Sequence, residues 1–175
     1  ILTNELPAFQ WSRIFRTLRI MELSGEVLTG HFFEGISGLQ FINHISYGLL
    51  KDHFDTEVFY WINATDPASL CAIPLPFIKS TLPPRLSSTC LIYRGKRLVV
   101  VSFKNGKDLE CRFSVHDPDA MEICKYISRL AKSGISPMSA KKIEMINGVS
   151  VFENELAEYF IRVGFVREYK SLAIE

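Results

Sequence analysis

The sequence lacks the features that would assign it at once to a membrane protein, a secreted protein or a nucleotide-hydrolysing enzyme. Its 175 residues contain no run of about 18 apolar residues and no signal-peptide pattern, so neither membrane insertion nor secretion is indicated. They also contain no G-x-x-x-x-G-K-[ST] phosphate loop and no D-E-x-H sequence. This chain therefore cannot hydrolyse ATP through those motifs.

Cysteine and histidine are present, but neither shows the spacing of a metal site. No C-x-x-C pair occurs, and the four cysteines are far apart, with apolar or mixed neighbours. We therefore predict reduced, buried thiols in a cytoplasmic protein and assign no metal ligand. The cysteines are Cys71, Cys90, Cys111 and Cys124, and the histidines are His31, His44, His53 and His116.

A large excess of charge of one sign is also missing. The formal net charge is +1, which gives no overall attraction to a polyanion. Any surface that binds nucleic acid must then be a local patch. Charge is uneven along the chain, because basic residues concentrate between Arg85 and Arg112, whereas residues 117–122 are acidic.

The first part of the chain predicts a basic helix followed by a hairpin, which is a winged helix in outline. Gly25 lies where a helix would need a C-terminal cap, and two short apolar runs follow it at 26–33 and 39–43. Apolar residues recur at intervals of three and four, the spacing of one helix face, and arginines occupy the opposite face. The apolar set is Trp11, Ile14, Phe15, Leu18 and Met21, and the basic set is Arg13, Arg16 and Arg19.

Such a helix has a direct use in nucleic-acid binding. A helix about 10 to 12 Å across fits the major groove of duplex DNA, and a hairpin beside it can contact phosphates. We therefore predict phosphate contacts from Arg13, Arg16 and Arg19. Docking of another protein stays open at this point, because winged helices also serve that purpose.

Four segments of the chain, in order, match the motifs of one family. They are G-E-x-x-x-G-x-F-F-x-G-x-x-G-L-Q-F at 25–41, A-T-D-P-A-S-L at 64–70, L-I-Y-R-G-K at 91–96, and I-N-G at 146–148 with L-A at 156–157 and G-F at 164–165. They resemble G-E…G-x-F-V-x-G-x-x-G-E-Q-F, A-x-D-P-x-N-L, V-L-Y-R-D-G and I-D-G…S-P-L-A…L…A-G-F of the large helicase-related (Lhr) proteins. Leu39, Ser69 and the Gly95-Lys96 order depart from the family's usual residues.

The resemblance implies the C-terminal region of an ATP-dependent superfamily 2 helicase of the DEAD/DEAH-box type. The chain is too short for the two motor domains of such a helicase, and it starts with Ile1, so we expect a fragment of a longer protein. ATP and Mg²⁺ are expected for the motor domains of the parent and no cofactor for this fragment. The implied work is non-catalytic: binding single-stranded or duplex DNA, or a DNA:RNA hybrid, and steering it for the upstream domains.

The rest of the chain predicts an α+β protein in three subdomains. The first subdomain is a partial winged helix at 1–53, which ends in a helix at 42–53. The second is a bent antiparallel sheet or small barrel at 54–116. It includes strands at 57–64, 71–73 and 88–114, with a type I′ turn at Asn105-Gly106. A small α/β unit at 117–175 follows. Its expected elements are a helix from Asp117 to 134, a strand at 142–146, a tight turn at 147–148, a helix from Asn154 to 163 and a strand at 165–174.

Further candidate contacts lie on the predicted strands. Arg94, Lys96 and Arg97 are candidates for phosphate contacts from a hairpin. Trp61 follows Tyr60, and alternate strand residues face opposite ways, so one of these two rings should be partly exposed. An exposed ring beside basic strands can hold single-stranded nucleic acid by stacking, and Trp61 is our candidate.

A catalytic alternative belongs to a different class of function. The C-terminal regions of some Lhr proteins are similar in architecture to winged-helix DNA glycosylases, which act on a damaged or deaminated base. Such a site needs a carboxylate or glutamine that positions water beside a flipped nucleotide, and Gln40, Asp66 and Glu110 are the candidates. None of them is part of an evident catalytic motif, and we assign no catalytic residue.

Overall fold

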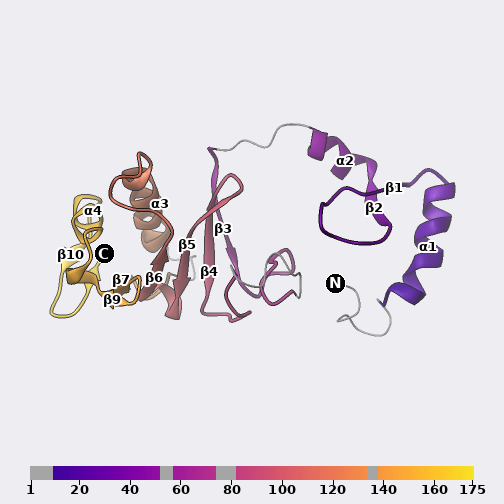
Figure 1. Ribbon diagram of the computed structural model, residues 1–175. Coiled ribbons are helices and arrows are strands. Elements are labelled where there is room, and N and C mark those ends of the chain that lie inside the picture. Colours follow the sequence, from indigo (N-terminus) through magenta and orange to yellow (C-terminus); the bar gives the residue numbers. More distant parts are fainter. Residues whose placement is uncertain (1–9, 52–56, 74–81, 134–137) are drawn as a thin grey trace. The chain divides into compact units, whose positions relative to one another are not determined.

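The computed structural model describes residues 10–51, 57–73, 82–133 and 138–175, which form two compact units of helices and strands (Figure 1). Unit 1 holds the elements up to Lys51, and unit 2 holds the elements from Phe59 onward. This mixture confirms the predicted α+β class. Within the described ranges the sheets are open, so the bent-sheet alternative holds in place of the barrel.

Unit 1 follows the predicted order of helix, hairpin and helix. Its elements are α1 (Trp11–Leu23), β1 (Val27–Gly30), β2 (Gln40–Asn43) and α2 (His44–Lys51). The two strands are antiparallel, with Val27 opposite Asn43 and Gly30 opposite Gln40. Among residues 10–51 only Val27 is buried, so both helices expose much of their surface.

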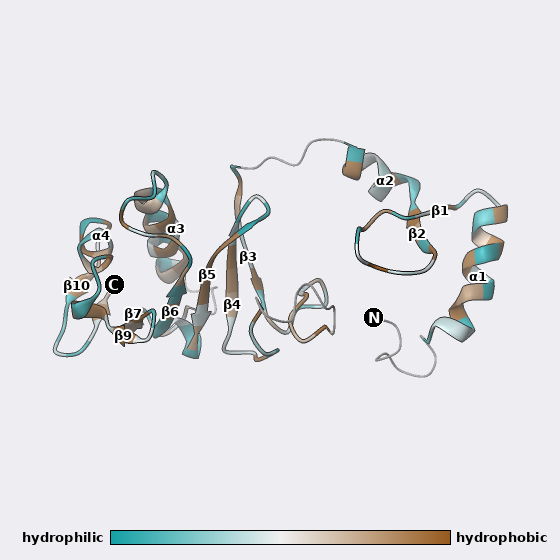
Figure 2. Cartoon of the chain, viewed as in Figure 1, coloured by the Kyte–Doolittle hydropathy of each residue, from teal (hydrophilic) through white to brown (hydrophobic). Residues whose placement is uncertain are grey.

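Unit 2 is built on a six-stranded sheet whose order is β3-β4-β5-β6-β8-β9. The pairings β3–β4–β5–β6 are antiparallel and confirm the predicted meander, whereas β8 joins β6 in parallel. Figure 2 shows hydrophobic colour along much of β4 and β5. The strands are β3 (Phe59–Asn63), β4 (Cys90–Arg94), β5 (Arg97–Phe103), β6 (Asp108–Cys111), β8 (Met145–Ile146) and β9 (Val149–Ser150).

Helix α3 (Ala120–Lys132) packs on one face of this sheet and forms the main core with it. Ile123 and Ile127 of α3 are fully buried with Val100 and Leu109 of the sheet. Helix α4 (Ala157–Arg162) adds Phe160 to the same core. A three-stranded sheet, in the order β10-β11-β7, completes the unit; its strands are β10 (Val166–Arg167), β11 (Leu172–Ala173) and β7 (Lys142–Ile143). Short 3₁₀ turns lie at Lys104–Gly106 and Val151–Glu153.

Three predicted strands are wrong in detail. The strand at 142–146 is divided into β7 and β8, because the backbone N–H groups of Glu144 and Met145 both donate to the carbonyl of Lys107 and bend the chain. The strand at 165–174 is instead the β10–β11 hairpin, closed where Glu168 N–H donates to Ser171 at 2.8 Å. Residues 71–73 form a turn, in which Ala72 has a φ of 58° that strands do not adopt.

Both helices of unit 2 begin downstream of their predicted starts at Asp117 and Asn154. Helix α3 begins at Ala120, and the carboxylate of Asp117 accepts the N–H of Asp119 at 3.1 Å in the turn before it. Helix α4 begins at Ala157, and Asn154 accepts the N–H of Leu156 at 3.0 Å. In both cases the polar side chain closes a turn that leads into the helix instead of capping the helix itself.

All four cysteines are buried and free, as predicted. Burial raises the pKa of Cys90 and Cys124 to about 12, and it also raises the pKa of Cys111. These thiols therefore stay protonated at neutral pH.

Candidate nucleic-acid interface

The end of α1 is fixed by the sequence around Gly25. Glu26 N–H donates to Met21 at 2.8 Å and Gly25 N–H donates to Glu22 at 3.0 Å, which is the bonding pattern of a Schellman cap. Gly25 has a φ of +77°, a left-handed conformation that favours glycine. The first glycine of the family-like segment therefore stops the helix and turns the chain into β1.

One face of α1 packs on the hairpin through aromatic rings. Trp11 and Phe15 have ring centroids 5.1 Å apart, and each also contacts the ring of Phe41 in β2, at 5.9 and 6.1 Å. A pocket of about 720 Å³ opens beside this cluster, between α1 and the loop that joins β1 to β2. The apolar face predicted from the spacing is therefore the face that holds the hairpin.

The hairpin loop, residues 31–39, is organised by the amide of Gln40. Its Oε1 accepts the backbone N–H groups of Phe32 and Phe33, both at 2.8 Å. Its Nε2 donates to the carbonyls of Phe33 and Ile36, at 3.1 and 2.9 Å. One side chain thus satisfies four backbone groups of the loop, which gives the glutamine of the family-like motif a structural role.

Helix α2 is tied to the same hairpin. The side chain of Asn43 accepts Ser46 N–H at 2.7 Å, as a helix cap does, and His44 Nε2 lies 2.8 Å from the carbonyl of Gly25. The ring of Tyr47 meets that of Phe32 with centroids 5.8 Å apart. The hairpin, the end of α1 and the start of α2 therefore hold one another.

The basic face of α1 points away from the packed face. Arg13 and Arg16 are exposed, and neither makes an ion pair with any residue that the structure describes. Arg19 is also exposed, but its guanidinium is paired with the carboxylate of Glu22, one helical turn ahead. Of the three predicted arginines, two are therefore uncompensated cations on a solvated helix face.

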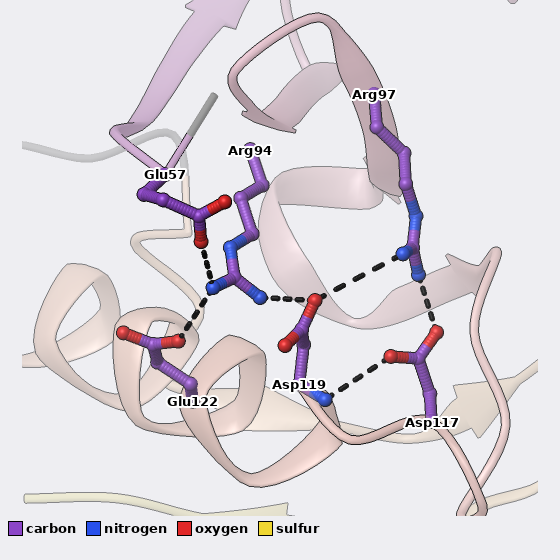
Figure 3. Close-up of polar contacts among 6 residues, drawn as sticks. All are labelled: Glu57, Arg94, Arg97, Asp117, Asp119 and Glu122. Atoms are coloured by element: carbon purple, nitrogen blue, oxygen red, sulfur yellow. Dashed lines mark hydrogen bonds and ion pairs between the residues drawn. The ribbon is translucent and has the colours of Figure 1, made fainter. Parts of the chain in front are cut away.

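The predicted arginines of unit 2 have different surroundings (Figure 3). Arg94, at the end of β4, is ion-paired with Glu57, Asp119 and Glu122, and its side chain is only 13% exposed. Arg97 is paired with Asp117 at 2.5 Å. Both guanidinium groups are therefore directed onto the acidic start of α3, and the phosphate role predicted for them has to compete with these carboxylates.

The charges in this cluster shift each other's proton affinity. The hydrogen bond to Asp119 raises the pKa of Arg94 against the opposing effect of burial, and the carboxylate of Glu57 adds to the increase. At Asp117 burial acts to raise the pKa, but the Asp119 N–H and the Arg97 guanidinium outweigh it and lower the pKa. Both shifts favour the charged forms of Arg94 and Asp117, and the cluster joins the sheet to α3.

Lys96 and Trp61 occupy unlike positions. Lys96 is exposed in the turn between β4 and β5 and has no ion pair among the described residues. Trp61 faces α3 and is partly buried against the core. The exposed ring of the pair is Tyr60, at 43%, so the prediction that one of the two would be exposed is confirmed.

Tyr60 forms a contact that the sequence did not predict. Its ring is stacked on that of Tyr93 in the neighbouring strand, with centroids 5.1 Å apart and an interplanar angle of 6°. Tyr60 and Tyr93 are directly paired across β3 and β4. The alternation of residues along β3 predicts which face Tyr60 occupies. Its stacking partner depends on the register between β3 and β4, which the sequence alone does not give.

The residues considered for a glycosylase are each engaged in local structure. Gln40 is used by the loop of the hairpin, and Asp66 accepts Ala68 N–H at 2.8 Å in a turn. Glu110 is paired with Arg112 at 2.9 Å. These contacts are structural ones, and nothing in the described part of the chain favours a catalytic use of the three side chains.

Comparison with known proteins bears on unit 1. None of the helices that the structure describes is long and apolar enough to span a membrane. A search of curated proteins finds no match to the chain. Residues 1–58 match the family model described as large helicase-related protein, winged-helix domain. The first third of the chain is thus similar to the winged-helix domain of a large helicase-related protein, as the resemblance implied.

Proposed function

We propose that this chain is an accessory module that binds nucleic acid through α1 and steers it for the motor domains of an ATP-dependent helicase. The observation behind this proposal is the pair of exposed, uncompensated guanidinium groups of Arg13 and Arg16 on the helix face opposite the hairpin. Guanidinium groups bind phosphate oxygens with paired, charge-assisted hydrogen bonds. Arg19, whose guanidinium is already ion-paired with Glu22, adds a weaker contact.

The ligand that fits this surface is a phosphate backbone. The loop at 31–39 beside α1 contains Glu34 and no lysine or arginine, so in unit 1 the attraction to a polyanion is concentrated on α1. A helix that contacts phosphates through two arginines positions DNA, or a DNA:RNA hybrid, without selecting a base sequence. This matches the needs of a motor that has to move along any sequence.

A titration of labelled oligonucleotides tests the proposal. We expect the variant Arg13→Gln/Arg16→Gln to lose about tenfold in affinity for duplex and single-stranded DNA at low salt, since two phosphate contacts are removed. The matched control is Lys125→Gln/Lys132→Gln, which removes two exposed cations from α3 and changes the net charge equally. Equal affinities for the two variants would reject the role of α1.

Docking of another protein is a second candidate, favoured by the apolar surface of unit 1. Seven large apolar side chains of unit 1 are at least 36% exposed: Trp11, Ile20, Leu23, Phe33, Leu39, Ile45 and Leu49. Exposed apolar surface on this scale marks interaction sites. If the chain binds no oligonucleotide at low salt, this second function takes the place of the first.

A further inference from the structure

The face of the unit 2 sheet that is turned away from α3 contains an aromatic pair with no part in the core. Phe59 stacks on Tyr126 of α3, with centroids 4.9 Å apart, which defines the face covered by that helix. Tyr60 is the next residue in β3 and points to the opposite face. There it stacks in parallel on Tyr93, while the buried side of the same face is formed by Leu91 and Val101.

Tyr60 is the outer member of this pair. Strand β3 is at the edge of the six-stranded sheet, so none of the described strands lies beyond Tyr60. Tyr93 is the only ring that contacts it within the described part of the chain. An aromatic side chain that is 43% exposed, and whose plane is fixed by a stacked neighbour, offers a flat surface of defined orientation.

The surroundings of the pair suit a polyanion with flat groups. The carbonyl of Val58 accepts Gly95 N–H at 2.8 Å, which places the β4–β5 turn, and with it the uncompensated Lys96, beside the start of β3. Burial raises the pKa of Tyr60, and it raises the pKa of Tyr93 to about 12, so both phenols are neutral at physiological pH and do not repel phosphate.

We propose that Tyr60, held in place by Tyr93, is a stacking platform for an unpaired base of single-stranded nucleic acid. The platform rests on the proposed function only in that its ligand is nucleic acid, since it lies in unit 2 and uses a different interaction. Stacking of a base on an aromatic side chain contributes about 1 to 3 kcal/mol and tolerates every base, because every base has a π-face.

The test compares an oligonucleotide with bases to one without. In the full chain, Tyr60→Leu is expected to weaken binding of labelled oligothymidine by about 5- to 150-fold, the equivalent of one lost stack. Tyr60→Phe retains the ring and should bind as the unaltered protein does. An abasic oligonucleotide of the same length, which offers phosphates but no bases, should bind equally weakly to all three.

The matched control is Tyr169→Leu, which removes a tyrosine that is 91% exposed in the same unit. Oligothymidine affinity that is unchanged in Tyr60→Leu, or reduced equally in Tyr169→Leu, overturns the platform. If Tyr60→Phe also has a reduced affinity for oligothymidine, the effect belongs to the hydroxyl group, and stacking is rejected. The α1 proposal is tested separately from the platform, because Arg13→Gln/Arg16→Gln should weaken binding of the oligothymidine and of the abasic oligonucleotide to the same extent. If this variant binds both as the unaltered protein does, the α1 proposal fails, whatever the result for Tyr60→Leu.

Discussion

Gln40 accepts the backbone N–H of Phe32 at 2.8 Å through its side-chain oxygen, and this bond begins a set of four that holds the loop of the winged helix in shape. The same side chain was a candidate for catalysis on sequence grounds. Since both its oxygen and its nitrogen are used by the backbone, the structure explains the glutamine as a support for the loop next to α1.

Removal of that support should loosen the loop. In Gln40→Ala, the amide hydrogens of Phe32 and Phe33 lose their acceptor, and we expect their hydrogen exchange to accelerate by about tenfold, since one hydrogen bond contributes about 1 kcal/mol. The control is Gln10→Ala, because Gln10 precedes α1 and makes no side-chain cap bond. Native-state exchange measured by NMR checks this, and equal rates in the two variants would contradict the role of Gln40.

The Arg94 cluster should contribute to the stability of unit 2. Arg94→Met removes the cation of Glu122 and leaves Asp119 with only its longer ion pair to Arg97, at 4.0 Å, so we expect the free energy of unfolding to fall by about 2 kcal/mol. Lys96→Met, two positions away and exposed, should change it by less than about 0.5 kcal/mol. Urea unfolding followed by tryptophan fluorescence measures both, and an Arg94→Met variant as stable as Lys96→Met would show that the cluster is not stabilising.

Asp117 should make the stability depend on pH in the acid range. Its pKa is lowered in the folded chain, so its charge stabilises the fold above the ordinary carboxyl pKa and that contribution is lost as the pH falls through the lower, folded value. Asp117→Asn should therefore be less stable than the unaltered chain by about 0.5 kcal/mol at pH 7, and this difference should vanish once the pH falls below the lowered pKa of Asp117. Asp66→Asn, which alters a turn carboxylate with no ion pair among the described residues, should show a smaller difference at pH 7.

The cysteines should be unreactive until the chain unfolds. All four are buried, and the pKa of Cys90 and Cys124 is raised to about 12, so the thiolate that attacks disulfide reagents is scarce at pH 8. Labelling with a chromogenic disulfide should be slow in the native chain and should reach four thiols in denaturant. Fast labelling of any one thiol before unfolding would show that its site opens readily.

Local signals in the sequence predicted most of unit 1 and the meander of unit 2. The spacing of Trp11, Phe15 and Leu18 and the position of Gly25 are properties of a single segment, so the helix and its end needed no long-range information. The tight turn at Asn147-Gly148 is of the same kind, and both residues have positive φ angles of 52° and 80°.

The other Asn-Gly pair shows where local signals fail. A type I′ turn was predicted at Asn105-Gly106, and both residues have positive φ angles, but Lys104 has one as well and the loop between β5 and β6 has four residues, from Lys104 to Lys107. Asn105 N–H donates to Ser88 and its carbonyl accepts Ala140 N–H, while a Cβ on Gly106 would come within 3.1 Å of Met138. Contacts with distant segments thus set the shape of this turn, and they cannot be derived from the dipeptide.

Some residues of the candidate site could be placed from local patterns, and others depend on long-range packing. Arg13 and Arg16 could be placed on an exposed face from helical periodicity alone. Arg94 and Arg97 could not be recognised as partners of the acidic residues at 117–122, because that pairing depends on how α3 packs on the sheet. The Tyr60–Tyr93 stack depends on strand register, which is also a long-range property.

The salt dependence of DNA binding tests the central claim, that α1 binds phosphates, most directly. We expect the logarithm of the duplex association constant to fall linearly with the logarithm of salt concentration between about 50 and about 200 mM, and the slope to become shallower by about two in Arg13→Gln/Arg16→Gln, since two phosphate contacts and their released counterions are lost. The slope of Lys125→Gln/Lys132→Gln should match that of the unaltered chain. Identical slopes for all three proteins would contradict a phosphate-binding role for this helix.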